Sequence, residues 1–112
     1  MPRATTLEAQ ALARTVHELL VLATLRDGDK HGYQIALDVE EQSEGAFVFQ
    51  HGTLYPILHR LEADKRIRGC WSGAHGQRRR KVYALTRSGR QRLEAGRESC
   101  RETFQRLLDF LE

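Results

Sequence analysis

The stretch TLYPILHRLE, residues 53–62, predicts a helix that has one apolar and one polar face. Its apolar side chains recur at steps of three, one and three, and they are Leu54, Ile57, Leu58 and Leu61. A proline breaks the interior of a helix, but with Thr53 as the N-cap, Pro56 becomes the third helical residue. The missing N–H of Pro56 would have no partner in that first turn, so a proline is tolerated there. The stretch therefore marks the start of a helix.

Hydrogen-bonding groups occupy the opposite face of this helix and the residues just before it. Hydroxyl groups suit phosphate oxygens, and the backbone N–H groups of a helix N-terminus also favour phosphate. Amide, imidazole and guanidinium groups can reach the edges of bases. The candidate DNA-binding residues of this region are Gln50, His51, Thr53, Tyr55, Pro56, His59 and Arg60. A place in the core is the alternative for Tyr55, and Thr53 could both cap the helix and bind phosphate.

The segment that follows, residues 65–92, holds ten of the eighteen basic residues of the chain and no acidic one. It carries about +10, and a local field of this size attracts a polyanion, most commonly nucleic acid. The alternative is a merely solvated face. Interleaved apolar residues favour a folded surface instead, and they are Cys70, Trp71, Val82, Tyr83, Leu85 and Leu93. The residues of the segment expected to bind DNA are Lys65, Arg78, Arg79, Arg80 and Lys81, whereas Arg87, Arg90 and Arg92 could pair with acidic residues of the chain.

The patterns around these segments complete the expected fold. Helical spacing predicts a first helix from residue 7 or 9 to residue 25 and a second helix over residues 32–41. Residues 68–72 and 79–85 predict two strands joined by a glycine-containing turn. Thr86 is placed to cap a last helix that reaches almost to the end of the chain. The result is a mainly α protein with a small β-hairpin, a winged helix-turn-helix followed by a long C-terminal helix.

The last helix carries an apolar stripe with the spacing of a coiled coil. The stripe runs from Leu93 to Leu111 in steps of four and three and is interrupted by Arg97. A long stripe without a partner in a chain of 112 residues needs a second chain. We therefore expect residues 1–86 to form a DNA-binding domain and residues 87–112 a dimerisation helix, in one compact unit.

Other classes of protein find little support in the sequence. No apolar run is long enough for a membrane span, and the polar N-terminus lacks the apolar core of a signal peptide, so we expect a cytoplasmic protein. Cys70 and Cys100 are expected to be reduced, buried thiols. The five histidines are scattered without metal-ligand spacing, and no nucleophile or phosphate loop is recognisable. We expect no catalytic residue, no metal site and no cofactor.

Four motifs, in order and at matching spacing, resemble the PadR family of transcriptional regulators. HGTLYPILHRLE at residues 51–62 resembles the recognition helix of that family, and HGY at residues 31–33 resembles the entry to its second helix. Trp71 stands where the family commonly has a tryptophan on the first wing strand. RKVYALTRSG at residues 80–89 resembles the second wing strand and the turn into the last helix. The motif at the second helix adds Tyr33 to the candidate DNA-binding residues.

The resemblance implies a homodimer that binds double-stranded DNA at a roughly palindromic operator. Such a protein usually acts as a repressor that a small molecule or a stress signal releases, and it dimerises through its last and first helices. The candidate dimerisation residues are Leu12, Val16, Leu93, Cys100, Phe104, Leu107, Leu108 and Leu111. A small-molecule effector would bind at this dimer interface. The alternative function is a module for a small anion or a nucleotide, in which DNA binding is secondary.

Overall fold

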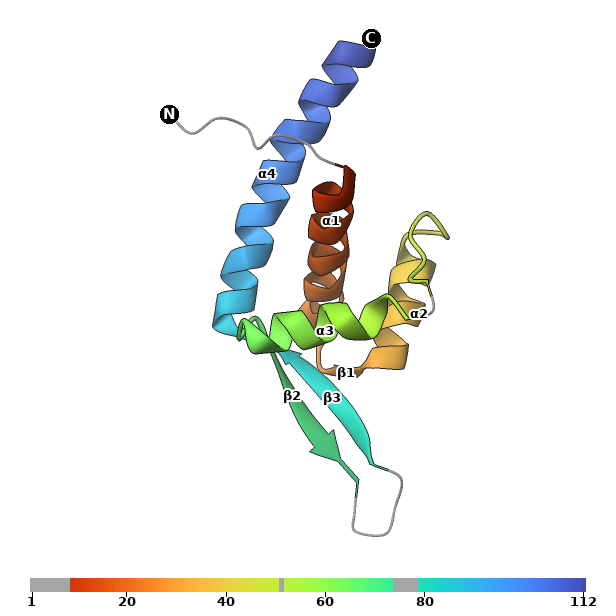
Figure 1. Ribbon diagram of the computed structural model, residues 1–112, viewed down its shortest axis with the longest axis vertical. Helices are drawn as coiled ribbons and strands as arrows, with labels where there is room; N and C mark the ends of the chain where they lie inside the picture. Colours follow the sequence, from red (N-terminus) through yellow and green to blue (C-terminus); the bar gives the residue numbers. More distant parts are fainter. Residues whose placement is uncertain (1–8, 51, 74–78) are drawn as a thin grey trace.

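The computed structural model describes residues 9–50, 52–73 and 79–112, and it places three helices above a small sheet with a long fourth helix alongside (Figure 1). The elements are α1 (Ala9–Thr24), the short 3-10 helix η1 (Leu25–Asp27), β1 (Lys30–His31), α2 (Gly32–Gln42), α3 (Leu54–Ala63), β2 (Ile67–Ser72), β3 (Arg80–Leu85) and α4 (Arg87–Leu111). β2 and β3 form a hairpin that projects away from the helices (Figure 1). The predicted class, a winged helix-turn-helix with a long C-terminal helix, is confirmed.

The helix predicted from residues 53–62 forms as α3, and Pro56 is its third residue. The apolar face that was predicted to be buried is buried along its whole length. The expected cap is the exception. Thr53 occupies the N-cap position, but its backbone is helical and its side chain makes no capping hydrogen bond. The start of α3 thus depends on its buried face and on Pro56 more than on a cap.

The sheet has three antiparallel strands in the order β1-β3-β2, one more strand than the hairpin predicted from the sequence. The additional strand is only two residues long. Lys30 pairs with Tyr83 and His31 with Val82 of β3. These pairings attach the wing to the start of α2, because α2 begins directly after His31.

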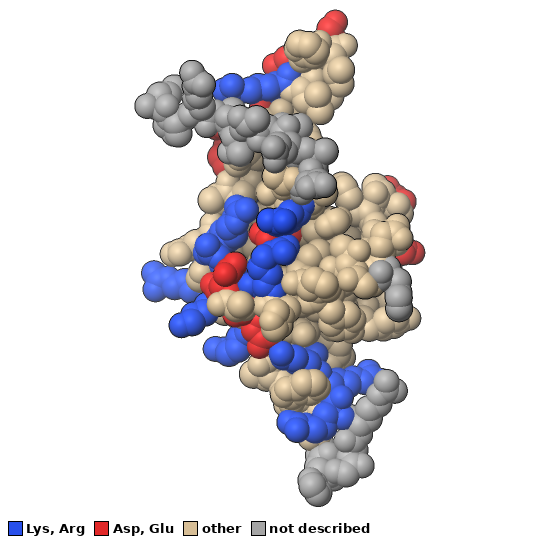
Figure 2. All heavy atoms as spheres, viewed as in Figure 1, with Lys and Arg blue, Asp and Glu red and all other residues tan. Residues whose placement is uncertain are grey.

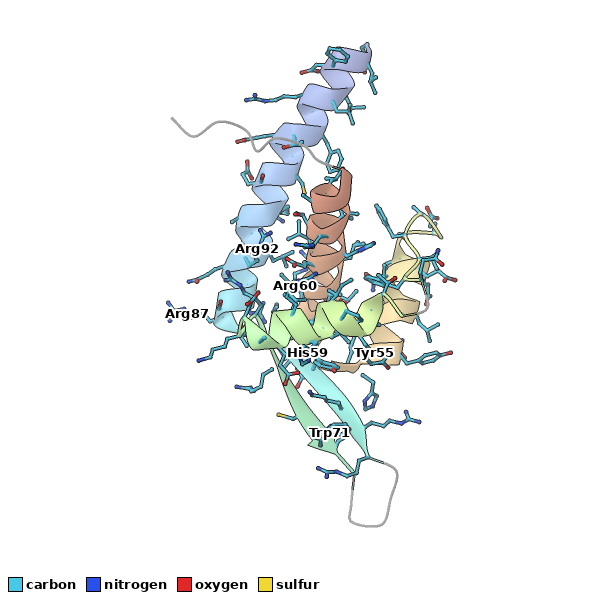
Figure 3. The ribbon with its side chains drawn as sticks, viewed as in Figure 1. Tyr55, His59, Arg60, Trp71, Arg87 and Arg92 are labelled. Carbon is cyan, nitrogen blue, oxygen red and sulfur yellow. The ribbon has the colours of Figure 1, made fainter. Side chains whose placement is uncertain are left out.

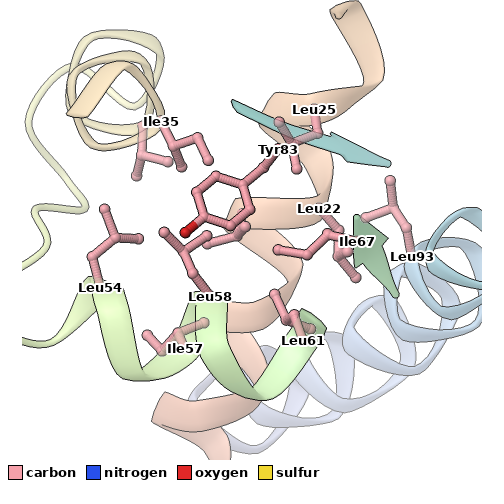
Figure 4. Packing of buried hydrophobic residues seen from close by; sticks show 12 residues of the cluster. Leu22, Leu25, Ile35, Leu54, Ile57, Leu58, Leu61, Ile67, Tyr83 and Leu93 are labelled. Carbon is pink, nitrogen blue, oxygen red and sulfur yellow. The ribbon is translucent and has the colours of Figure 1, made fainter. Parts of the chain in front are cut away.

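A single core joins the helices to the base of the wing (Figure 4). Leu22 of α1, Ile35 of α2 and Leu58 of α3 are fully buried in it. Among the described residues of the two long strands, Ile67 of β2 and Tyr83 of β3 are buried in this core, and the partly buried Leu85 of β3 packs against it. Farther out, the wing has two exposed faces. The expectation that Cys70 and Trp71 are buried is therefore wrong, because both are exposed where the hairpin leaves the core.

The start of α4 is locked to the turn that follows α3. Thr86 accepts a hydrogen bond from Gly89 N at 3.0 Å, which confirms it as the N-cap. Its hydroxyl lies 2.7 Å from the carbonyl oxygen of Lys65 and 2.8 Å from that of Arg66, so it can donate to either. Arg66 also donates to Ser88 Oγ at 2.8 Å. The wing and α4 are therefore held against one another at this corner.

Among the described residues, no helix is both long and apolar enough to cross a membrane.

Candidate nucleic-acid interface

A cleft of about 520 Å³ lies between the start of α2, the start of α3 and the wing. Apart from Gly32, the residues that line it have aromatic or basic side chains. The lining residues are His31, Gly32, Tyr33, Tyr55, Trp71, Arg79, Arg80, Lys81 and Tyr83. Five residues predicted to bind DNA meet here: Tyr33, Tyr55, Arg79, Arg80 and Lys81. Such a mixture of cations and flat rings can bind phosphate groups and stack on bases or sugars.

The polar face of α3 borders this cleft. Tyr55 and His59 lie on the side of α3 from which the wing projects (Figure 3). Tyr55 is 62% exposed, which rules out the alternative that it is a core aromatic. Its ring nevertheless lies close to the start of α2, because a Cβ on Gly32 would come within 3.3 Å of the ring and of the hydroxyl. Because it has no side chain, Gly32 thus leaves room for the Tyr55 ring beside the start of α2.

Arg60, which was expected to reach DNA, is turned toward α1 (Figure 3). Its Nε donates to Glu18 Oε1 at 3.0 Å, and the Glu18 side chain is largely buried. In this arrangement Arg60 joins α3 to α1 and does not line the cleft.

The wing carries its cations against aromatic rings. The guanidinium carbon of Arg79 lies 5.5 Å from the centre of the Trp71 ring, within cation–π range. Lys81 Nζ lies 5.8 Å from the Trp71 ring and 5.6 Å from the Tyr83 ring, and it donates to Glu62 Oε1 at 2.8 Å. The hydrogen bond to Glu62 raises the pKa of Lys81 above that of a free lysine. Burial raises the pKa of Tyr83 above that of a free tyrosine.

Basic side chains cover the lower part of the molecule, from the start of α4 to the wing (Figure 2). Within the described ranges, no carboxylate lies within ion-pair distance of Lys65, Arg79 or Arg80. The same holds for the basic residues at the start of α4, so the pairing considered for Arg87, Arg90 and Arg92 is not found in this part of the chain. The positive potential of these side chains therefore faces solvent.

The remaining candidates lie around the cleft or beyond it. Pro56 is exposed at the first turn of α3, and Gln50 is exposed in the loop before it. Thr53 is half-buried at the start of that turn. Lys65 occupies the turn after α3 with a φ of 61°. Two candidates, His51 and Arg78, lie outside the residues that the structure describes.

A second hollow, an apolar groove of about 730 Å³, runs between α1 and α4. Leu12, Val16, Cys100 and Phe104, all predicted to take part in dimerisation, line this groove. Leu93 also borders it, but this side chain is 5% exposed and belongs to the core of its own chain. Beyond the groove, α4 extends past the start of α1 (Figure 1), and its apolar side chains there are exposed. These are Leu107, Leu108, Phe110 and Leu111.

The sequence did not single out three contributors to the site. The sequence marks Trp71 as an apolar residue of the basic segment and as a family feature, yet it is the cross-strand partner of Lys81 and bears two cations on its ring. Glu18 and Glu62, which hold two of the predicted DNA-binding cations, were not noticed at all. Residues two apart in a strand lie on the same face, so the sequence places Arg79 and Lys81 on one face of the second wing strand. This shared face was the available signal that one aromatic ring could lie between the two cations.

Comparisons with known proteins identify the family of the chain. The sequence model of the family described as transcriptional regulator PadR-like matches residues 21–95. The transcriptional regulator Rv3488 of Mycobacterium tuberculosis is 34% identical over 95 residues, 85% of each protein. A Lysinibacillus sphaericus protein is 26% identical over 71 residues, and the chain spans 65% of the length of that relative.

Solved structures of PadR-family regulators are also similar to this chain. A PadR family transcription regulator from Clostridium difficile is 32% identical with a TM-score of 0.73, over 86% of this chain and 98% of the other. Bacillus subtilis PadR, solved in complex with operator DNA, is 29% identical with a TM-score of 0.65. That match covers 71% of this chain and 46% of the Bacillus protein, so the chain spans less than half the length of that regulator.

Proposed function

Because the chain belongs to the PadR-like family of transcriptional regulators, we propose that it is a homodimeric, sequence-specific repressor that binds a palindromic DNA operator. The observation that carries this proposal is the cleft that joins the exposed face of α3 to the cations of the wing. The similarity to Bacillus subtilis PadR, which was solved with operator DNA, supports the same function.

In the proposed complex, α3 lies in the major groove and its exposed polar face meets the edges of the bases. His59 and Gln50 are the groups proposed to choose sequence. The hydroxyls of Tyr55 and Tyr33 bind phosphate oxygens beside them. The wing follows the backbone, where Arg79 and Arg80 bind phosphates. Contacts of this second kind strengthen binding to any duplex and set the register of α3 on the DNA.

A second copy of the chain completes the proposed repressor. The exposed apolar end of α4 is the surface offered for dimerisation, because a stripe of this kind is stabilised when a partner helix covers it. Residues 87–112 would then form the dimerisation helix and residues 1–86 the DNA-binding domain. A two-fold symmetric dimer presents two copies of α3 to two half-sites, which is the reason to propose a palindromic operator.

The apolar groove between α1 and α4 is the proposed site for a releasing signal. Its volume of about 730 Å³ suits a small molecule, and its lining is mainly apolar. A molecule in this groove would alter the packing of α1 on α4, and α1 is joined to α3 through Glu18 and Arg60. Binding there could therefore change the position of the recognition helix.

The cleft also supports a second candidate function, the binding of a small anion or a nucleotide. Tyr33, Trp71 and Arg79 line a volume of about 520 Å³, which is within the range of small-ligand sites. A free nucleotide in this cleft would occupy the surface proposed for DNA. On this alternative, nucleotide binding is the main activity and any DNA binding is weak and independent of sequence.

A mobility-shift experiment separates the two functions. The probes are the duplex upstream of the protein's own gene and a shuffled duplex of equal length and composition, at one salt concentration. We expect binding of the first to be tighter by roughly a thousandfold or more, as for other specific DNA-binding proteins. Equal affinity for both duplexes would contradict the proposed repressor. Displacement of either duplex by micromolar nucleotide would favour the second function.

A further inference from the structure

One ion pair joins the last turns of α3 to the wing. Lys81 Nζ donates to Glu62 Oε1 at 2.8 Å, and the two side chains are only 28% and 31% exposed. Glu62 belongs to the recognition helix, and Lys81 belongs to the strand that carries the cations of the wing. The pair thus connects the element proposed to choose sequence with the element proposed to hold the backbone.

The wing is shaped to accommodate this pair. Gly69 of β2 lies directly beneath it, and a Cβ at this position would collide with Lys81 Cε and come within 3.0 Å of Glu62 Oε2. Any other residue at position 69 would therefore push the two side chains aside. Lys81 also lies within cation–π distance of Trp71 and Tyr83, so its amine has one carboxylate and two rings around it.

We propose that Glu62 is a positioning residue for sequence recognition, which holds the wing at a fixed angle to α3 and keeps the charge of Lys81 from binding DNA phosphate. This inference rests on the proposed DNA-binding function. It also replaces the direct phosphate contact expected for Lys81 from the sequence.

The physical reason is that the hairpin carries cations with a carboxylate partner and cations without one. Arg79 and Arg80 have no carboxylate partner among the described residues, so both are free to bind phosphates of any duplex. A further free cation on the same hairpin would strengthen binding to every duplex, including those on which α3 does not meet its preferred bases. Glu62 neutralises this further cation. The same bond restrains a hairpin that otherwise projects from the body (Figure 1).

The test compares two substitutions that remove one negative charge each. Glu62→Gln breaks the pair with Lys81. Glu94→Gln is the matched control, because Glu94 is an exposed carboxylate on α4 that pairs with Arg97 at 3.0 Å. The probes are a duplex enriched by the wild-type protein from a random-sequence library and a shuffled duplex of equal composition. Binding is measured by fluorescence anisotropy over a series of sodium chloride concentrations.

We expect Glu62→Gln to strengthen binding to the shuffled duplex about threefold or more and to steepen its salt dependence by about one unit, because one more amine meets phosphate. The enriched duplex should not gain in the same way, because the wing is no longer held at the angle that sets the register of α3, so the ratio of affinities for the enriched and shuffled duplexes should fall by a similar factor. Glu94→Gln should leave the ratio and the slope close to wild type. Equal behaviour of the two variants would overturn the inference.

Lys81→Met is the second variant, and its readout does not depend on stability. If Glu62 keeps the amine from DNA, this substitution leaves the salt dependence of the wild-type protein unchanged. A slope that falls by about one unit would mean that Lys81 binds phosphate in the complex, and the inference would be wrong. A wild-type protein without preference for the enriched duplex would instead overturn the proposed repressor, and this inference with it.

Discussion

Arg60 of α3 donates a hydrogen bond from Nε to Oε1 of Glu18 on α1, at 3.0 Å. The guanidinium group that the sequence predicts to reach DNA thus connects α3 to the helix that borders the apolar groove. This contact between α1 and α3 is a directional hydrogen bond between two charged groups, so a shift of α1 can be transmitted through it to α3. The pair has consequences for stability that can be measured without DNA.

Arg60→Met keeps the aliphatic stem of the side chain and removes its charge. We expect the free energy of unfolding to fall by about 1 kcal/mol, because the largely buried Glu18 loses its partner. Urea denaturation measures this change. In the Arg60→Met background, Glu18→Gln should cause little further loss, since both substitutions remove the same interaction. Losses that simply add would show that the two side chains do not act together.

The ion pair between Lys30 and Asp38 predicts a dependence of stability on pH. Lys30 Nζ lies 2.6 Å from Asp38 Oδ2, and Gln34 donates to the other oxygen at 2.8 Å, so the pKa of Asp38 is lowered first by Lys30 and then by Gln34. A carboxyl group whose folded-state pKa is lowered stabilises the fold above its unfolded pKa, about 3.9. That stabilisation is lost as the pH falls through the folded-state value.

Asp38→Asn should therefore reduce the free energy of unfolding by about 1 kcal/mol at pH 7. The difference from wild type should shrink as the pH falls below about 4. Chemical denaturation at a series of pH values measures both effects. Asp29→Asn is the control, because Asp29 is exposed and forms no ion pair among the described residues. A loss for Asp38→Asn that stayed constant down to pH 2 would contradict the assignment.

Gly89→Ala tests the corner between the wing and α4. Alanine favours a helix over glycine by about 1 kcal/mol. At this position, however, a Cβ would collide with the carbonyl oxygen of Arg66 and lie 2.7 Å from Leu85 Cδ1. We expect a net loss of about 1–2 kcal/mol in thermal or urea denaturation, because a backbone atom cannot move aside as a side chain can.

Gly96→Ala on the same helix is the comparison. Its Cβ would meet the end of the flexible Leu19 side chain, which can rotate away. The change in stability should stay within about 0.5 kcal/mol of zero. Equal effects at both positions would mean that contact with the Arg66 backbone does not decide the outcome.

Leu108→Glu tests the proposed dimer. Leu108 is half exposed in the last turns of α4, so a carboxylate there costs the single chain little. In a dimer it would be buried against the partner helix, and sedimentation velocity should show a monomer. Ser99→Glu adds the same charge at an exposed position away from the apolar stripe and should remain dimeric. A Leu108→Glu dimer as tight as wild type would place the interface elsewhere.

Much of the fold could be predicted because its signals are local. Pro56 and the apolar steps around it determined where α3 begins and which face is buried, and Thr86 marked the start of α4. β1 could not be predicted, since a strand of two residues has no periodicity and exists only through its pairing with β3.

The details of the site depended on contacts between distant residues. The sequence predicts free cations at Arg60 and Lys81, because Glu18 and Glu62 lie far away in the sequence and contact them only in the fold. Cys70 and Trp71 looked like core residues because an apolar residue in a strand is usually buried on one face. Within the part of the chain that the structure describes, the wing contacts the core through the residues of its base, Ile67, Tyr83 and Leu85, and no second layer covers its outer part.

The most direct test of the central claim compares Arg79→Ala and His59→Ala on the enriched and shuffled duplexes over a range of salt concentrations. We predict that Arg79→Ala weakens binding to both duplexes equally and lowers the salt slope by about one unit, because the proposed role of Arg79 is to hold phosphate. His59→Ala should instead reduce binding to the enriched duplex alone and leave the slope unchanged, because the proposed role of His59 is to meet bases. If Arg79→Ala leaves affinity and slope untouched, or His59→Ala weakens both duplexes alike, the assignment of backbone to the wing and sequence to α3 is contradicted.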